Sequence, residues 1–185
     1  MFTFRQPGMR VLSGSVLLIC LVAPYALAAE REPTESQVKA AYLYNFGKFI
    51  EWPGPDASQG SSPFRLCVFN DKSFELTLRE VVNGKSIGPH PVAVVPVYDP
   101  AQGRDCQILF ISVGHGKDAL QILQELRNTR VVTVGEMDGF LEAGGTINFV
   151  LEDDHVRFQV NEKAASHADL HISSRLLAVA RLVVR

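Results

Sequence analysis

The sequence predicts an α/β fold: a three-layer-like sheet of mainly parallel strands, with helices on both faces and an antiparallel hairpin at one end. Two observations carry this prediction. Short apolar runs typical of buried strands alternate with helical segments along most of the chain, and strands separated in this way favour right-handed crossovers in a parallel sheet. After Gly144-Gly145 the alternation stops, and two β-rich runs flank a short polar connection, which is typical of a hairpin.

The first 28 residues are predicted to be an export signal and not part of the fold. Arg5 and Arg10 precede an almost wholly apolar run, and Ala26-Leu27-Ala28 has the small-x-small pattern that signal peptidase recognises. The apolar run is shorter than the roughly 20 residues of a membrane-spanning helix. We therefore expect cleavage after Ala28, a periplasmic location without direct membrane anchoring, and a single domain over residues 29–185.

The charge of the mature chain argues against a nucleic-acid partner. The whole sequence has 18 Lys and Arg against 20 Asp and Glu. The leader holds two of the basic residues and no acidic one, so 16 basic residues face 20 acidic ones after cleavage, a net charge of −4. Binding to phosphates needs a basic face, and this balance does not favour one.

The cysteine content favours a disulfide. Removal of the leader removes Cys20 and leaves Cys67 and Cys106, and an even pair in an oxidising compartment is more often bonded than free. The bond would close a loop of about 40 residues, which the chain-entropy model values at about 3 to 4 kcal/mol. Two buried, reduced thiols are the alternative. A zinc site is disfavoured, because neither cysteine has a second cysteine or a histidine at ligand spacing.

The first element of the mature chain is predicted to be an amphipathic helix that ends at Trp52-Pro53. Thr34 and Gln37 have the spacing of a capping box. Apolar residues then recur at helical spacing, at Val38, Tyr42, Phe46 and Phe49. Together with Glu51-Trp52-Pro53, these aromatic residues are interpreted either as core or as a partner-binding face. The stretch from Gly54 to Pro63 is rich in Gly, Ser and Pro and is expected to be an exposed loop.

The remaining elements follow from the same periodicities. The pattern predicts strands at 64–69, 92–97, 107–112 and 131–134, helices at 73–82 and 118–128, and a hairpin of 146–151 with 156–160. The chain is expected to close with helical segments, because an apolar stripe recurs near its end at Leu176, Leu177, Ala180 and Val183.

No catalytic constellation is expected from the residue spacing. The segment Ser112 to Lys117 lies between a strand and a helix, as phosphate loops do, but it lacks the early glycine and the hydroxyl after the lysine. Ser112, His115 and Asp118 are too close along one turn to adopt the orientation of a triad. His167 and His171 are four residues apart, yet a third metal ligand is not evident. The chain is therefore predicted to be non-enzymatic, without metal or cofactor.

Four ordered phrases resemble a known family. They are the segment from Val38 to Pro53; Cys106-Gln107-Ile108-Leu109-Phe110-Ile111-Ser112; Thr133-Val134-Gly135 with Gly139-Phe140; and Gly144-Gly145-Thr146-Ile147-Asn148-Phe149-Val150. Asn161 and Ser173-Ser174-x-Leu176-Leu177 also fit. In these phrases the chain resembles the YfiR family from about Val38 to its C-terminus.

The resemblance implies a regulatory function. It implies a periplasmic protein, typically a homodimer, that binds the periplasmic sensor region of an inner-membrane diguanylate cyclase and represses it, which lowers cyclic di-GMP and biofilm formation. It also implies an intramolecular bond between Cys67 and Cys106. The best-known member has a second cysteine pair around the region 139–149, where this sequence has none, so redox control through that second bond is not expected.

Two sets of site residues follow from these functions. For the protein partner, the candidates are Arg175, Leu176 and Leu177, because buried apolar anchors and Arg supply most interface energy. The alternative function is a periplasmic small-molecule-binding protein that feeds a membrane sensor. It would place a ligand at the carboxyl ends of the parallel strands, near Asn70, Ser112 and Gly135.

Overall fold

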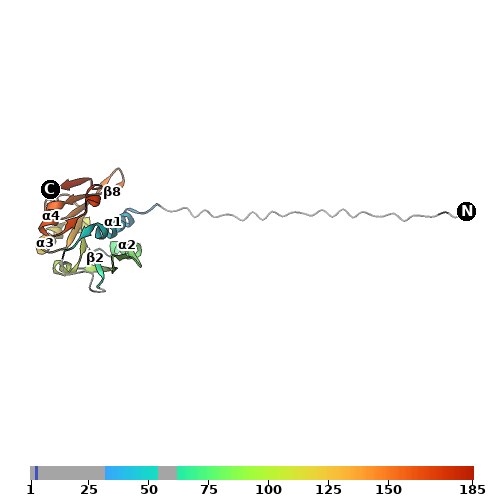
Figure 1. Cartoon of the computed structure of the whole chain (residues 1–185), viewed down its shortest axis with the longest axis horizontal. Coiled ribbons are helices and arrows are strands. Elements are labelled where there is room, and N and C mark those ends of the chain that lie inside the picture. The colour runs from blue at the N-terminus through green and yellow to red at the C-terminus, as the bar shows by residue number, and fades with distance from the viewer. Residues whose placement is uncertain (1–2, 4–31, 54–61) are drawn as a thin grey trace. The chain divides into compact units, whose positions relative to one another are not determined.

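In the residues that the structure describes, eight strands form one sheet, in the order β10-β8-β7-β6-β5-β2-β4-β3 (Figure 1). The computed structural model describes residue 3 and residues 32–53 and 62–185, and Pro33–Arg185 form one compact unit. The elements in chain order are α1 (Glu35–Phe49), β1 (Ile50–Glu51), β2 (Phe64–Phe69), α2 (Lys72–Val82), β3 (Ser86–Ile87), β4 (His90–Val97), η2 (Pro100–Asp105), β5 (Ile108–Phe110), η3 (Val113–His115), α3 (Gly116–Glu125), β6 (Val132–Gly135), β7 (Ile147–Glu152), β8 (His155–Asn161), α4 (Glu162–His167), β9 (His171–Ile172), α5 (Ser174–Leu177) and β10 (Leu182–Val184).

The strand directions confirm the predicted fold class. Strands β4, β2, β5, β6 and β7 are neighbours in parallel, and β7 and β8 form the predicted antiparallel hairpin. Asp153 and Asp154 connect the hairpin with φ angles of 48° and 59°, as two-residue hairpin turns require. The parallel strand β10 lies beyond β8 at one edge of the sheet, and the antiparallel strand β3 forms the other edge.

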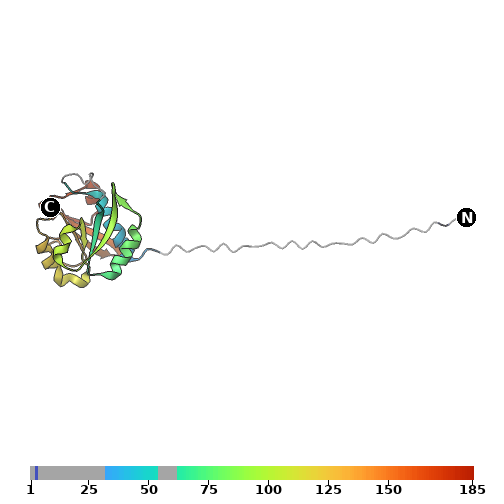
Figure 2. The same cartoon turned by 90° about the horizontal axis from the view of Figure 1, so that it is seen from below.

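Both faces of the sheet are covered, and the side chains of β2 alternate between them. Leu66 and Val68 belong to a core cluster with residues of α1 and α2. Cys67 and Phe69 belong to a second cluster, which includes residues of α3. Because both faces are buried, β2 has an apolar run and not an alternating pattern. Figures 1 and 2 show α1 and α2 packed side by side, and Figure 1 shows α3 across the strands from them.

The first helix supplies the aromatic centre of one cluster. Its N-terminus has the predicted capping box between Thr34 and Gln37. Phe46 is fully buried, and its ring lies 5.8 Å from that of Phe149 on β7 and 5.1 Å from that of Phe158 on β8. The helix thereby packs across the hairpin strands of the sheet. The apolar residues that the sequence placed on one face of this helix belong to the core or pack against it.

The structure joins Cys67 and Cys106 by a disulfide, as expected from the sequence. Their Cα atoms are 6.0 Å apart, and both residues are buried in the cluster beneath α3. Cys67 lies on β2 and Cys106 is the residue after η2. The bond therefore fixes η2, which precedes β5, to the centre of the sheet.

Close packing against one phenylalanine ring explains two of the glycines in the segments that carry the family resemblance. A Cβ atom at Gly135 would lie 2.6 Å from the ring of Phe140, and one at Gly145 would lie 2.2 Å from the same ring. Phe140 is itself 2% exposed. The two glycines are thus required by close packing against this ring.

Several element boundaries differ from the predictions. The first helix ends at Phe49 and not at Trp52-Pro53, because Ile50–Glu51 forms strand β1 and pairs with β9 in a separate sheet. Trp52 packs edge-on against Phe64 at 5.2 Å and donates its Nε1 proton to the carbonyl of Arg130, which supports the core interpretation. The predicted loop falls largely on residues 54–61, which lie outside the described part of the chain.

The prediction that the chain closes with helical segments was wrong beyond the first helical turn. Helix α5 spans only Ser174–Leu177, and Val183 lies in strand β10, which pairs with β8. Apolar residues three to four positions apart fit a helix over two turns. The backbone hydrogen bonds of β8 stabilise a strand there instead.

Candidate functional site

The predicted ligand residues lie where the sequence placed them, at the carboxyl ends of strands. Asn70 follows β2, Ser112 follows β5, and Gly135 ends β6. His115 links the first two: its Nε2 donates to the carbonyl of Asn70 at 3.1 Å, and its backbone N–H donates to the carbonyl of Ser112 at 3.0 Å. Gly135 instead faces the ring of Phe140. The ligand assignment for these three residues stays a prediction.

The histidine geometry disfavours a hydrolytic triad. His115 Nδ1 lies 3.5 Å from Asp118 Oδ2, while Nε2 is used by the carbonyl of Asn70. This nitrogen therefore already carries a proton and is not placed to take one from Ser112.

The structure separates the two histidines considered for metal binding. His167 ends α4, whereas His171 lies on β9, so they do not share a helix face. Within the described ranges, no group of three or more His, Cys, Asp or Glu residues is arranged to hold a metal ion. None of the helices described is both long and apolar enough to span a membrane.

A partly buried ion-pair network ties α1 to the carboxyl edge of the sheet. Glu136 follows β6, and its carboxylate accepts one hydrogen bond from Lys39 and another, at 2.9 Å, from the backbone N–H of Val113. Lys39 also pairs with Glu35. The side chains of Lys39 and Glu136 are each only 14% exposed. The network fixes the positions of three segments: the start of α1, the turn after β5 and the end of β6.

The charge of Lys39 is stable against changes in pH. Burial lowers the pKa of Lys39, but the hydrogen bonds and negative charges of Glu136 and Glu35 outweigh it and hold the pKa above its ordinary value. Because its pKa is raised, the Lys39 ammonium stays protonated at every pH below the ordinary pKa of lysine. Lys39 therefore contributes a constant positive charge at this edge.

Exposed aliphatic side chains surround this network. Val113 is 65% exposed and Leu151, near the tip of the hairpin, is 58% exposed. Together with the network they line a cavity of about 430 Å³. We call Lys39, Val113, Glu136 and Leu151 the carboxyl-edge surface.

A second cavity connects the carboxyl-edge surface to the last strand of the sheet. It has a volume of about 390 Å³ and shares Val150 and Leu151 with the first cavity. Its other wall includes Leu182, which is 48% exposed, and Arg181, which pairs with Glu152 at 2.9 Å. Aliphatic side chains thus alternate with paired charges along one continuous surface.

The predicted partner residues lie elsewhere, and one of them is not on the surface. Leu176 is 5% exposed and belongs to the core, and Leu177 is partly buried against the same cluster. The side chain of Leu176 is therefore part of the core, and its assignment to the partner-binding site stays a prediction. Arg175 is exposed. The sequence pattern missed Leu151, since alternation along a strand does not show how far a hairpin extends beyond the helix that covers it.

Comparisons with known proteins agree with this fold. A family model described as YfiR/HmsC-like matches residues 36–181. Among solved structures, the chain is similar to a conserved domain protein from Vibrio cholerae O1 biovar El Tor strain N16961, with a TM-score of 0.57 and 7% sequence identity over 81% of this chain. It is also similar to the ABC domain, in complex with L-Trp, from Streptococcus pneumonia, with a TM-score of 0.53 and 9% identity over 80% of this chain. The chain spans 60% of the length of each of these two structures, and at these identities the likeness concerns the fold alone.

Proposed function

This chain belongs to the YfiR/HmsC-like family, and we propose from this premise that it binds and represses the periplasmic sensor region of an inner-membrane diguanylate cyclase. The family supports a periplasmic, non-catalytic regulator of cyclic di-GMP signalling in general. The disulfide between Cys67 and Cys106 fits an oxidising compartment. The proposal goes further than the family match in two respects: it names a diguanylate cyclase as the partner and repression as the mechanism.

The observation that supports direct protein binding is the composition of the carboxyl-edge surface. Val113 and Leu151 expose more than half of their side chains, which costs free energy in water and is recovered when a partner covers them. Lys39 pairs with both Glu136 and Glu35, so a partner that covers this region meets carboxylates that already have a positively charged neighbour. Apolar anchors beside satisfied polar groups are typical of interface centres.

Export is part of the proposal. Residues 1–28 have the sequence of a cleavable leader, and the mature domain over residues 29–185 would meet the sensor region outside the cytoplasm. Cyclic di-GMP would then be controlled without any contact between this protein and the nucleotide. The net charge of −4 after cleavage is consistent with a protein partner.

We also propose that the protein is a homodimer, with β10 in the interface between the two copies. This strand lies at the edge of the sheet, and Leu182 and Val184 are 48% and 38% exposed. An edge strand with apolar side chains tends to pair with another chain. Light scattering should give the mass of two chains, and the mass of one chain at micromolar concentration would contradict the dimer.

Deletion and complementation test the function in the cell. Deleting the gene should raise cyclic di-GMP and biofilm formation, and the exported protein should restore both to the wild-type level. A version without residues 1–28 should fail to complement, because it stays in the cytoplasm and does not reach the sensor region. Unchanged cyclic di-GMP after deletion, or full complementation by the leaderless version, would contradict the proposal.

A further inference from the structure

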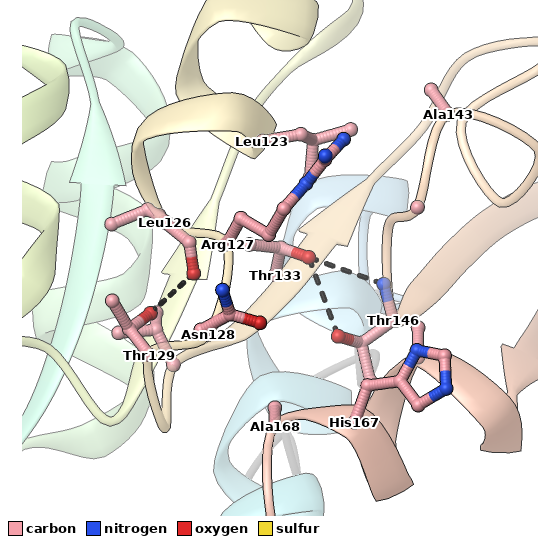
Figure 3. A pocket seen from close by; sticks show the side chains of 13 residues that line it. Leu123, Leu126, Arg127, Asn128, Thr129, Thr133, Ala143, Thr146, His167 and Ala168 are labelled. Atoms are coloured by element: carbon pink, nitrogen blue, oxygen red, sulfur yellow. Dashed lines mark hydrogen bonds between the residues drawn. The ribbon is translucent and has the colours of Figure 1, made fainter.

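Another cavity lies at the opposite end of the sheet from the carboxyl-edge surface. It is lined at the amino ends of β6 and β7 by Val131, Thr133 and Thr146, with a volume of about 350 Å³. Figure 3 shows Leu123 and Arg127 on one side, His167 of α4 on the other, and the two threonines between them. We call it the amino-edge pocket; its remaining lining residues are Leu126, Asn128, Thr129, Ala143, Gly144, Ala164 and Ala168.

The floor of the amino-edge pocket has an unused hydrogen-bond donor. Thr133 Oγ1 accepts the backbone N–H of Thr146 at 3.1 Å and lies 3.4 Å from Thr146 Oγ1. Each hydroxyl carries one proton, but only one of the two protons can lie along this shared contact. Both oxygen atoms have a partner in this contact, so neither is an unpartnered buried atom within the described residues, and each threonine is only 4% exposed. The second proton is free to bond an oxygen atom of a molecule bound in the pocket.

The charge at the mouth of the pocket favours an anion. Arg127 is exposed at the mouth and makes no ion pair within the described part of the chain. No Asp or Glu is among the 13 lining residues. A guanidinium with no competing carboxylate is suited to a carboxylate of a ligand, which it can bind through two parallel hydrogen bonds.

The walls between the mouth and the floor are apolar. Leu123, Leu126 and Val131 are buried side chains of the cluster beneath α3, and Ala164 and Ala168 form part of the facing wall. The volume is near the lower end of the roughly 300 to 1,000 Å³ of small-molecule sites. The pocket therefore has room for a molecule about as large as one substituted ring.

We propose that the amino-edge pocket binds a small monocarboxylate with a compact apolar body and an oxygen acceptor at its far end. The carboxylate pairs with Arg127, the body contacts the leucines, and the far oxygen accepts the spare proton of the Thr133 and Thr146 pair. Because the pocket and the carboxyl-edge surface lie at opposite ends of the sheet, such a ligand can bind while the partner is bound. The proposal does not depend on the identity of that partner.

Titration calorimetry with 4-hydroxybenzoate as the probe tests the proposal. Saturable binding is expected, and 4-hydroxybenzyl alcohol, which lacks the carboxylate, should bind about tenfold more weakly or worse. Benzoate, which lacks the far oxygen, should bind several-fold more weakly. The ligand pair tests the threonine contact without a substitution in the core.

A matched pair of arginine variants locates the site. Arg127→Gln should weaken binding of 4-hydroxybenzoate about tenfold or more, whereas Arg157→Gln, at an exposed position on β8 outside the pocket, should leave it unchanged. Equal affinities for wild type and Arg127→Gln, or no saturable binding of 4-hydroxybenzoate up to about 10 mM, would overturn the proposal.

Discussion

At the scale of single residues, Glu75 shows how burial and charge act together. It is 2% exposed on α2 and pairs with Lys72 at 3.1 Å and with Arg79 at 2.8 Å. The hydrogen bond from Arg79 is the largest cause that lowers the pKa of Glu75, and it outweighs the opposite effect of burial. A lowered pKa means that the ionised carboxylate stabilises the fold above the usual carboxyl range. This stabilisation is lost as the pH falls through the lowered pKa.

We therefore predict that Glu75→Gln lowers the urea midpoint at pH 7, and that its difference from wild type shrinks at about pH 3. The matched control is Glu80→Gln, an exposed residue on the same helix, which should change the midpoint little at either pH. Urea denaturation of the three proteins at both values makes the comparison. A Glu75→Gln difference of the same size at both values would mean that the pairs add nothing to the folded state.

At the scale of elements, the disulfide is a covalent constraint on the sheet. It joins β2 to the end of η2 across a sequence separation of 39 residues. Cys67→Ser should lower the free energy of unfolding by about 2 to 5 kcal/mol, the usual cost of losing a native disulfide from a small exported domain.

Denaturant midpoints measure the effect of the bond, and wild type with reductant serves as the control. The reduced wild type should approach the variant, because both lack the bond. Intact-mass measurement with an alkylating reagent should find no free thiol in the oxidised mature protein. A variant with the midpoint of wild type would show that the bond contributes nothing to stability.

The elements predicted best from the sequence are those defined by local pattern. The strand at 64–69 was predicted with its observed bounds, because a six-residue apolar run between turn residues has few other solutions. Strands β1, β9 and β10 are two or three residues long. They exist because distant segments supply their partners, so no local pattern could have predicted them. The stripe from Leu176 to Val183 was assigned to a helix for the same reason.

At the scale of the whole molecule, the sequence predicted the two faces of the sheet better than its surface. The apolar run of β2 already indicates that both faces of this strand are buried. The segments that resemble the YfiR family contain the two glycines that pack against Phe140. The carboxyl-edge surface arises instead from the way α1, the turn after β5 and the hairpin meet. Its charged centre joins Lys39 to Glu136, 97 residues later in the chain, a contact that only the folded topology brings about.

The central claim is that the carboxyl-edge surface binds the periplasmic segment of a membrane diguanylate cyclase, and two matched leucines test it most directly. Leu151 lies on this surface and is 58% exposed, whereas Leu120 lies on α3 and is 59% exposed. Neither is part of the buried core, so Leu151→Asp and Leu120→Asp should fold alike.

The measurement is titration of the mature protein and both variants with the purified periplasmic segment of an inner-membrane diguanylate cyclase from the same organism. The account predicts a complex with wild type, binding about tenfold weaker or worse for Leu151→Asp, and unchanged binding for Leu120→Asp. No complex with wild type at tens of micromolar or so, or equal affinities for Leu151→Asp and wild type, would contradict it.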